Sequence, residues 1–344
     1  MITPVILCGG NGTRLWPRSR AVKPKPFLPL VGDETLFEAA LSRAGDRSMF
    51  NAPMIVTGKG HLCHVEAQLT GAQDAKVLVE PAARNTAAAI ALAALRLPEE
   101  AVMLVCPSDH HIGDAGGFIR AAQEAALLAR QGWLVAFGIV ATAPETGFGY
   151  VKRGEAIPGS GGYKVDRFVE KPDLERAMQF LGEGTYSWNG GIFAFRAGDY
   201  LRELDQHRPD IAAAVREAVA RGTEEGRCFH PDATLFGAVP SESIDYAVME
   251  KTAHAAVVPA TMAWSDIGNW HALWEARDTD ENGNCVIGQA ELVNCRNVLV
   301  ESDGAHVSLI GLQDTIVVVD GGDVMVTSVS EVQKVGKLRG AVHQ

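Results

Sequence analysis

The chain has 344 residues, 47% of them hydrophobic and 21% charged, which is typical of a folded globular protein and excludes a disordered one. Its net charge is −11, from 31 Lys and Arg against 42 Asp and Glu, and this balance disfavours a nucleic-acid-binding protein because such proteins need a basic face. Without an uncharged apolar run of about 18 residues or a Cys-x-x-Cys pair, the sequence predicts no membrane span and a cytoplasmic location.

Short Val-, Ile- and Leu-rich runs alternate with Ala-rich helical patterns through the first half of the chain. The expected strands are Pro4–Cys8, Pro53–Thr57, Lys76–Val79, Ala101–Cys106 and Trp133–Gly138. The expected helices are Glu34–Ala44, Asn85–Leu95 and Gly117–Arg130. This alternation predicts an α/β protein with a mixed, mostly parallel sheet flanked by helices. Ligands of such sheets bind beyond the carboxyl ends of the strands.

The pattern changes twice in the second half of the chain. Strands are expected at Val151, Tyr163–Val169 and Gly190–Phe195, and helices at Asp173–Leu181 and Pro209–Arg221. After about Ala276, short Val-rich pieces separated by Gly, Asp or Asn predict a stacked β-region or short β-helix. A last helix is expected over Ser330–Leu338. We therefore predict two domains, 1–280 and 281–344.

A glycine-rich segment follows the first expected strand. Its glycines are Gly9, Gly10 and Gly12. Backbone N–H groups can converge there on an anion because no Cβ obstructs them, and Arg14 and Lys25 can add charge for a polyphosphate. The segment is neither a Walker A loop nor a complete GxGxxG motif, since Leu15 stands where the third glycine would be. An ordinary turn with solvent-facing basic residues is the alternative.

A second polar cluster, Cys106-Pro-Ser-Asp-His-His111, ends the expected strand Ala101–Cys106. A carboxylate at this edge of a parallel sheet suits Mg²⁺, which takes one or two protein carboxylates plus phosphate oxygens and water. Asp109 is the first candidate ligand, and an Asp that caps the next turn is the alternative. The two histidines lack a third ligand at usable spacing for a transition metal, and the similar group His61, Cys63 and His64 on an amphipathic stretch is discounted equally.

Five further segments place polar groups beside Gly, Pro or an aromatic residue. They are Glu80–Thr86, Thr146–Tyr150, Phe168–Pro172, Trp188–Ile192 and Trp264–Gly268. Each alone is consistent with an ordinary turn. Because they recur after apolar runs, we expect them to contribute to one site assembled from several strand ends.

These segments resemble those of the mannose-1-phosphate guanylyltransferases, or GDP-mannose pyrophosphorylases, within the sugar-phosphate nucleotidyltransferases. The most specific pieces are Gly10-Asn-Gly-Thr-Arg-Leu-Trp-Pro17, Pro24-Lys-Pro-Phe-Leu28, Glu80-Pro-Ala-Ala-Arg-Asn-Thr86, Pro107-Ser-Asp-His110 and Trp188-Asn-Gly-Gly-Ile-Phe193. The resemblance covers nearly the whole chain. It implies a Rossmann-like catalytic domain followed by a small left-handed β-helix-like domain.

The resemblance also implies a role for individual positions. The nucleotide-binding positions would be Leu7, Gly9, Gly10, Gly12, Thr13, Arg84, Asn85 and Thr86. The sugar-phosphate-binding positions would be Gly147, Glu170, Lys171 and Asn189. The catalytic positions would be Arg14, Lys25, Asp109 and Asp266, of which the two aspartates would hold Mg²⁺. Ala88 and Pro26 depart from the residues that relatives commonly carry there.

The implied activity is transfer of GMP from GTP to α-D-mannose 1-phosphate, giving GDP-mannose and pyrophosphate. A related enzyme that uses another nucleoside triphosphate or hexose 1-phosphate is the nearest alternative. A homodimer is a possible assembly. Many bacterial relatives continue into a cupin-type isomerase domain, and because this chain stops at Gln344 we expect no isomerase activity.

Two alternatives from other classes remain open at this point. A dehydrogenase would explain the early Gly-rich strand end and would need an acidic residue about 20 positions later. Asp33 and Glu34 are there, but Lys23 and Lys25 between them and the glycines suit phosphate instead. A non-catalytic homologue that binds nucleotide and uses its β-region for assembly is the second alternative.

Overall fold

The computed structural model describes residues 1–10, 12–69 and 71–342, so Asn11 of the Gly-rich segment and the last two residues of the expected 281–344 domain lie outside it. The chain divides into two compact units that are interleaved in sequence. The first unit consists of Met1–Gly9, Ala40–Ser108 and Ile112–Trp264. The second unit consists of Gly10–Ala39, Asp109–His111 and Ser265–Gln344. Three elements, α1 (Leu36–Arg43), β5 (His111–Ile112) and β13 (Trp264–Ser265), cross the division.

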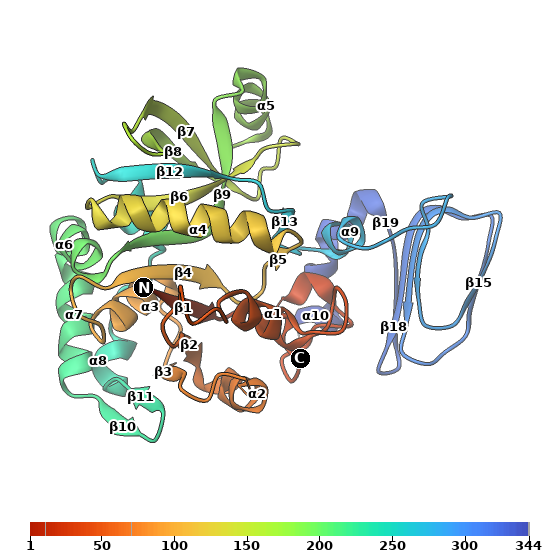
Figure 1. The fold of residues 1–344 in the computed structure, drawn as a ribbon. Coiled ribbons are helices and arrows are strands. Elements are labelled where there is room, and N and C mark those ends of the chain that lie inside the picture. The colour runs from red at the N-terminus through yellow and green to blue at the C-terminus, as the bar shows by residue number, and fades with distance from the viewer. Residues whose placement is uncertain (11, 70, 343–344) are drawn as a thin grey trace. The chain divides into compact units, whose positions relative to one another are not determined.

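The first unit is built on a mixed sheet, which Figure 1 shows from one edge strand, β10, to the other, β7. In the described part of the chain it has 11 strands in the order β10-β11-β3-β2-β1-β4-β9-β6-β12-β8-β7. The strands are β1 (Ile2–Cys8), β2 (Met54–Gly58), β3 (Lys76–Glu80), β4 (Val102–Pro107), β6 (Leu134–Val140), β7 (Gly149–Ala156), β8 (Tyr163–Glu170), β9 (Tyr186–Arg196), β10 (Thr223–Glu225), β11 (Cys228–His230) and β12 (Ala255–Ala260).

The sheet is less parallel than the sequence predicts. The run β11-β3-β2-β1-β4 is parallel throughout, and β6 pairs with β12 in parallel. From β9 onward most pairs are antiparallel, because β9 is antiparallel to β4, β6 and β7, and β8 is antiparallel to β7 and β12. The mixed α/β class is therefore confirmed, whereas the mostly parallel pairing is restricted to one half of the sheet.

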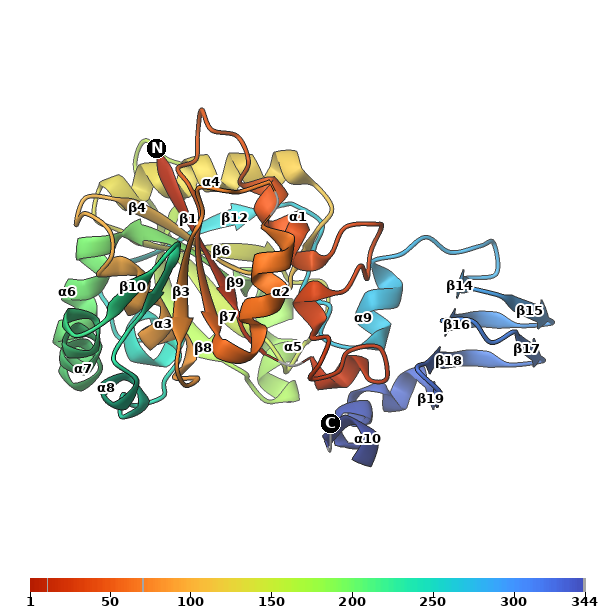
Figure 2. The ribbon, with the colours of Figure 1, turned by 90° about the horizontal axis from the view of Figure 1, so that it is seen from below.

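Helices cover both faces of this sheet, as Figure 2 shows with α4 on one face and α3, α6 and α7 on the other. The helices of the first unit are η3 (Lys59–His61), α2 (Leu62–Gln68), α3 (Asn85–Ala94), α4 (Ala115–Arg130), α5 (Leu174–Glu183), α6 (Ala197–His207), α7 (Pro209–Ala220), α8 (Ala233–Gly237) and the π-helix η4 (Asp245–Met249). Successive strand side chains point to opposite faces. Accordingly Met103 and Val105 of β4 join the core under α3, and Leu104 joins the core under α4.

The second unit has its own apolar core. Its helices are η1 (Thr13–Leu15), η2 (Lys25–Phe27), α9 (Trp270–Glu275), η5 (Val329–Lys337) and α10 (Arg339–Val342). Leu15 and Leu28 from the Gly-rich region pack in one cluster with Trp270, Ile316 and Val335. The Trp270 indole also donates a hydrogen bond to the carbonyl of Trp16, 2.9 Å away. Residues that are distant in sequence thus hold the Gly-rich region in place.

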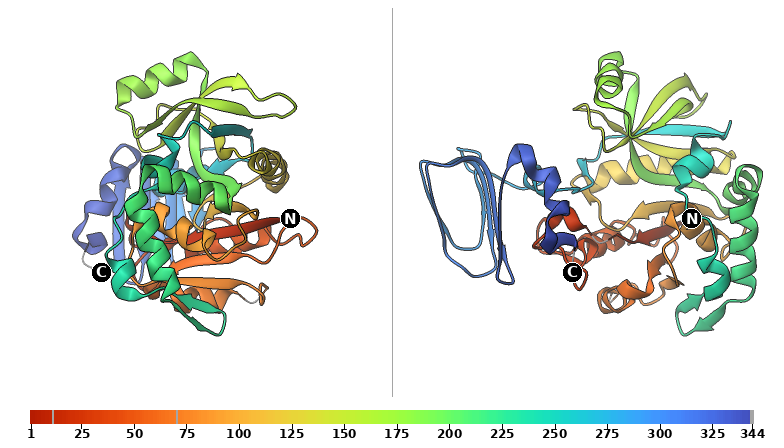
Figure 3. Two further views of the ribbon diagram at one scale, coloured as in Figure 1. Left: turned by 90° about the vertical axis from the view of Figure 1, so that its left-hand side faces the viewer. Right: turned by 180° about the vertical axis from the view of Figure 1, so that it is seen from behind.

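The strands of the second unit stack in two short sheets, visible in Figures 2 and 3. They are β14 (Cys285–Ile287), β15 (Ala290–Val293), β16 (Arg296–Ser302), β17 (Val307–Ile310), β18 (Gln313–Asp320) and β19 (Asp323–Ser328). β14, β16 and β18 pair in parallel, β15 pairs with β17 in parallel, and β19 closes the first sheet in antiparallel fashion. The expected stacked β-region is present, and the expected last helix is a 3-10 helix rather than an α-helix.

None of the described helices combines the length and the apolar character that crossing a membrane requires.

Candidate active site

Two glycines of the second unit give the Gly-rich segment its shape. Gly10 and Gly12 have φ angles of +87° and +61°, a region that residues with a Cβ rarely adopt. A Cβ on Gly12 would lie only 2.5 Å from Cβ of Lys25, so glycine is required there for packing as well. The segment continues into η1, which places Thr13 at the helix start and leaves the Arg14 side chain exposed. An exposed guanidinium beside a glycine turn suits an anionic ligand.

Lys25 brings together the two aspartates that the sequence nominates. Its side chain is buried, with 5% of the residue exposed, and its ammonium donates to Asp109 Oδ2 at 2.8 Å. The same ammonium donates to the main-chain carbonyl oxygen of Asp266. These three residues come from three separate segments of the second unit. Lys25 therefore lies between the aspartates, in contact with one carboxylate and with the other residue's backbone.

The electrostatics of this group favour an ionised Asp109. Burial raises the pKa of the Asp109 carboxyl, but the Lys25 ammonium and His110 outweigh burial and leave the pKa below its usual range. Within the described residues no three His, Cys, Asp or Glu side chains gather to hold a metal ion. Two carboxylates, Asp109 and Asp266, are the number of protein ligands that Mg²⁺ usually takes beside phosphate oxygens and water.

Asp266 stands in a strained turn of the second unit. Ile267, which follows it, is fully buried and has φ of +43°, an outlier for a β-branched residue. The N–H of Gly268 donates to Asp266 Oδ1 at 3.0 Å, and a Cβ on Gly268 would lie 2.6 Å from the same carboxylate. Such strain persists where the surrounding structure fixes it, often at functional sites. Here the turn and the hydrogen bond from Gly268 fix the direction of the Asp266 carboxylate.

The expected nucleotide-binding residues Arg84, Asn85 and Thr86 lie at the start of α3 in the first unit. Asn85 has φ of +64° and its side chain accepts the N–H of Thr86 at 2.8 Å. The Thr86 hydroxyl accepts the N–H of Ile244 at 2.9 Å, and the Arg84 guanidinium donates to the carbonyl of Gly237. These bonds tie the start of α3 to residues much later in the chain, which gives the segment a defined shape.

Glu80 is a functional candidate that the residue-by-residue prediction missed. It ends β3, and among the described residues its buried Oε1 has no hydrogen-bond partner. Burial raises the pKa of its carboxyl to about 7. An unused acceptor on a buried carboxylate has an energetic cost unless a ligand supplies the donor. The signal in the sequence was its position at the start of the motif Glu80–Thr86.

Three of the expected sugar-phosphate residues lie close together in the first unit, Glu170 and Lys171 at the end of β8 and Asn189 in the first half of β9. Glu170 Oε1 lies 3.0 Å from the exposed ammonium of Lys171, and this pairing raises the pKa of Lys171. A Cβ on Gly149 would lie 2.4 Å from Glu170 Oε2 and 3.2 Å from Cβ of Asn189, so glycine is required between them. Gly147 is exposed in the loop that precedes β7, two residues before Gly149.

A second residue that the sequence prediction missed, Asp245, contacts this group. Its Oδ1 accepts a hydrogen bond from Nδ2 of Asn189 at 2.9 Å. The ring of Phe148 makes edge contacts with Trp188 and Trp264, at centroid distances of 5.2 and 5.4 Å, in the core on the α4 side of the sheet. A single aspartate within an apolar run, Ile244 to Met249, gave no signal that it would face these residues.

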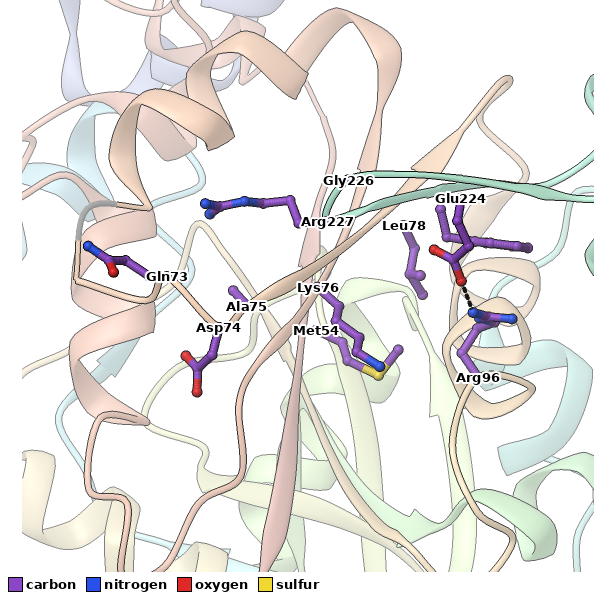
Figure 4. Close-up of a pocket in the computed structure, with 11 residues that line it drawn as sticks. Met54, Gln73, Asp74, Ala75, Lys76, Leu78, Arg96, Glu224, Gly226 and Arg227 are labelled. Atoms are coloured by element: carbon purple, nitrogen blue, oxygen red, sulfur yellow. Dashed lines mark hydrogen bonds and ion pairs between the residues drawn. The ribbon is translucent and has the colours of Figure 1, made fainter.

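Two of the cavities formed by the described residues, both apart from the predicted site residues, carry several charged side chains. Figure 4 shows one of about 240 Å³ in the first unit, lined by residues of β3 and of the β10–β11 hairpin, where Arg96 pairs with Glu224. The other, of about 800 Å³, belongs to the second unit and is bordered by Arg18 and Arg277. Both arginines already contact Glu301, and Asp33, Asp278 and Asp280 add further carboxylates to the lining.

The predicted residues therefore form two groups, one in each unit. The first unit holds Leu7, Gly9, Arg84, Asn85, Thr86, Gly147, Glu170, Lys171 and Asn189. The second unit holds Gly10, Gly12, Thr13, Arg14, Lys25, Asp109 and Asp266. Within the first unit Glu170 pairs with Lys171 close to Asn189, and within the second unit Lys25 joins Asp109 and Asp266. Gly147 lies in an exposed loop, where a Cβ would meet open space.

A mixed α/β sheet, a glycine turn with an exposed arginine and a pair of aspartates define a protein that handles nucleotides. Comparison with known families agrees, because the nucleotidyl transferase family model matches residues 3–283. The chain belongs to this nucleotidyl transferase family. Of the alternatives left open by the sequence, the family assignment favours nucleotidyl transfer over a dinucleotide-dependent dehydrogenase.

Three proteins illustrate the similarity. A mannose-1-phosphate guanylyltransferase of Salmonella montevideo is 42% identical over 346 residues, which cover 98% of this chain and 73% of that protein. The alginate biosynthesis protein AlgA of Pseudomonas putida is also 42% identical, over 98% of this chain and 71% of that protein. The crystal structure of a Thermus thermophilus protein, described as a mannose-1-phosphate geranyltransferase, has a TM-score of 0.89 at 30% identity and covers 100% of both chains.

Proposed function

We propose that the chain transfers the GMP moiety of GTP to α-D-mannose 1-phosphate and releases pyrophosphate. A phosphate oxygen of the sugar phosphate attacks the α-phosphorus of GTP. The bond between that phosphorus and the oxygen bridging to the β-phosphorus breaks, and pyrophosphate leaves with the electron pair. The observation that carries this proposal is the 42% identity to a mannose-1-phosphate guanylyltransferase over 98% of the chain.

The site chemistry supports the same reaction. The attacking group is already an anion, so the reaction needs no activated Ser or Cys, and its difficulty lies in like-charge repulsion and alignment. Asp109 and Asp266 would hold Mg²⁺, which when bound supplies neutralising charge to the phosphates. The cluster around the Lys25 ammonium supports this assignment, because it keeps Asp109 ionised beside Asp266.

The chain's own cations have separate tasks in this proposal. Arg14, exposed on the glycine turn, stabilises charge on the transferring phosphoryl group. The buried Lys25 fixes the aspartates, and it contacts the nucleotide phosphates in the family-based assignment. The exposed Lys171, paired with Glu170, binds the phosphate of the sugar, and Asn189 binds a sugar hydroxyl. The backbone N–H groups of Gly9, Gly10, Gly12 and Thr13, with Leu7 beside them, surround the nucleotide.

Base selection in this proposal falls to Glu80 and the segment Arg84–Thr86. Guanine presents two adjacent N–H donors, at N1 and at the 2-amino group, and a carboxylate can accept both. The buried Oε1 of Glu80, unpaired within the described residues, supplies the missing partner. Adenine has no such pair of donors, so a buried carboxylate would be left unsatisfied beside it, which is the condition that gives strong discrimination.

The decisive experiment crosses four nucleoside triphosphates with mannose 1-phosphate and glucose 1-phosphate, and measures pyrophosphate release and the GDP-sugar. We expect GTP with mannose 1-phosphate to be the best pair. A preference for another pair would make the chain a related nucleotidyltransferase. Nucleotide binding without pyrophosphate release would identify a non-catalytic homologue, and chelation of Mg²⁺ by EDTA should abolish turnover.

For the region after residue 280 we propose a short left-handed β-helix that forms a separate domain, 281–344, and pairs two chains. Its parallel strands support this, as do residues with positive φ just before a strand, Asn294, or at the second position of a strand, Asn297 and Asp314. Exposed Val324 and Val326 on the edge strand β19 support a homodimer. A crystal structure would establish the handedness, and light scattering of Val326→Lys beside wild type would test the dimer. The substrates fit a cytoplasmic enzyme.

A further inference from the structure

Asp245 is a half-buried carboxylate that the proposed reaction does not use. It begins the π-helix η4, whose following residues Ala247, Val248 and Met249 are almost completely buried. Burial and the neighbouring Glu170 raise the pKa of the Asp245 carboxyl to about 6. Single-turn π-helices are rare and occur often at functional sites. An apolar residue would satisfy the packing here without the cost of burying a carboxylate.

Asp245 fixes the side-chain amide of Asn189. Nδ2 of Asn189 donates to Asp245 Oδ1 at 2.9 Å, and Oδ1 of Asn189 accepts the N–H of Gly191 at 3.1 Å. The two bonds together leave only one orientation of the amide, with its NH₂ toward the carboxylate and its oxygen toward the backbone. One N–H and one lone pair of Asn189 remain for a ligand.

The surroundings of Asn189 suit a phosphorylated sugar. Glu170 packs against Gly149 within the same group, and Lys171 supplies an exposed cation beside it. A planar amide and a carboxylate together can bind hydroxyl groups of a hexose, and the lysine can bind its phosphate.

We propose that Asp245 is a positioning residue that holds the Asn189 amide in the orientation required by a hydroxyl group of the hexose 1-phosphate. The inference rests on the proposed function, since it assigns a task within the sugar-binding half of that site. Asp245 acts through Asn189 and does not itself touch the sugar. Without Asp245, the Asn189 amide can rotate, so that either its N–H or its oxygen faces the hydroxyl group of the sugar.

The test is a double-mutant cycle in the full-length protein, assayed by pyrophosphate release with GTP and mannose 1-phosphate. Asp245→Ala should raise KM for mannose 1-phosphate about tenfold, roughly the effect of one lost hydrogen bond, and leave KM for GTP unchanged. The variant Asn189→Ala should have a similar effect. Because one residue acts through the other, the double variant should be no worse than Asn189→Ala alone.

Further variants separate positioning from mere stability. Asp245→Asn keeps an oxygen that can accept from Asn189, so it should restore most of the mannose 1-phosphate affinity. The variant Asp245→Leu keeps the buried volume without an acceptor and should behave like Asp245→Ala even if it is as stable as wild type. Asp199→Ala removes a buried carboxylate of the first unit, one held by Arg196 and Arg202, and should lower Tm without a selective change in KM.

Each outcome decides the inference. Effects of Asp245→Ala and Asn189→Ala that multiply, or a loss shared equally between GTP and mannose 1-phosphate, would overturn it while the proposed function stands. Failure of Asp245→Asn to recover affinity would also overturn it. A wild-type protein that releases no pyrophosphate from these substrates would instead overturn the proposed function, and the inference with it.

Discussion

Glu301 lies between two arginines in the second unit, and its removal should destabilise that unit strongly. The side chain is 5% exposed, with Oε1 3.0 Å from Nε of Arg18 and Oε2 2.7 Å from a guanidinium nitrogen of Arg277. Loss of Glu301 leaves Arg18 with Asp320, 2.8 Å away, as a remaining partner. Arg277 keeps the carbonyl of Leu30, a neutral acceptor, and its side chain is just 9% exposed.

The expected loss of stability follows from the difference between the partners that Arg18 and Arg277 retain. Breaking a buried ion pair leaves an uncompensated charge and costs about 3–5 kcal/mol. Because Arg18 retains a carboxylate, the penalty comes mainly from Arg277, and we expect Glu301→Ala to lower the free energy of unfolding by about 3 kcal/mol. Replacing both members with apolar residues, Glu301→Leu with Arg277→Met, should recover stability to within about 2 kcal/mol of wild type.

Urea unfolding followed by tryptophan fluorescence measures this effect, since Trp270 and Trp274 are buried in the core of the same unit. Glu331→Ala is the matched control, because Glu331 pairs with Lys334 on the surface of η5 and such pairs contribute under about 1 kcal/mol. The reasoning would be refuted if Glu301→Ala cost no more than Glu331→Ala, or if the double replacement were worse than Glu301→Ala.

Four further predictions concern the site and its surroundings. Asp109→Asn and Asp266→Asn should each lower kcat about 100-fold or more, and near-normal turnover would contradict the metal assignment. Asp109→Asn should also lower Tm, because it removes the charge partner of the buried Lys25 ammonium. The carboxylate of Glu80 accepts guanine N–H groups only when ionised, so KM for GTP should fall as pH rises through about 7, and Glu80→Gln should lose that pH dependence. Since its folded-state pKa is raised, Glu80 contributes stability that is present below about pH 4.5 and lost as pH rises through about 7, which urea midpoints across this range would check. Gly12→Ala should destabilise by about 1–3 kcal/mol through its φ angle and its contact with Lys25, whereas Gly182→Ala in α5 should not, and equal urea midpoints for the two variants would contradict this.

The sequence predicted the elements whose periodicity is local. The helix expected over Asn85–Leu95 is α3 (Asn85–Ala94), and the strand expected over Ala101–Cys106 is β4 (Val102–Pro107). Strand direction could not be predicted in the same way, because an alternating or apolar run has the same composition in either orientation. The antiparallel insertion of β9 between β4 and β6 therefore left no signal in the chain.

The site was predictable where a motif concentrates polar residues and less so where partners are distant in sequence. Asp109 and Lys25 were both nominated, but nothing local indicates that they contact each other across 84 positions. Asp245 was missed because one carboxylate in an apolar run has no periodic signature, and its significance appears only when Asn189 is found beside it. The roles of all these residues stay predictions until the variants are measured.

The interleaving of the two units has a consequence for how the chain folds during synthesis. Gly10–Ala39 leaves the ribosome among the first residues, yet its apolar partners, such as Trp270, Ile316 and Val335, are made last. The glycine-rich segment therefore remains unpacked until almost the entire polypeptide has emerged, although most of the first unit is complete much earlier. A ribosome-bound nascent chain lacking residues 265–344 should be protease-resistant in its sheet and protease-sensitive at that segment.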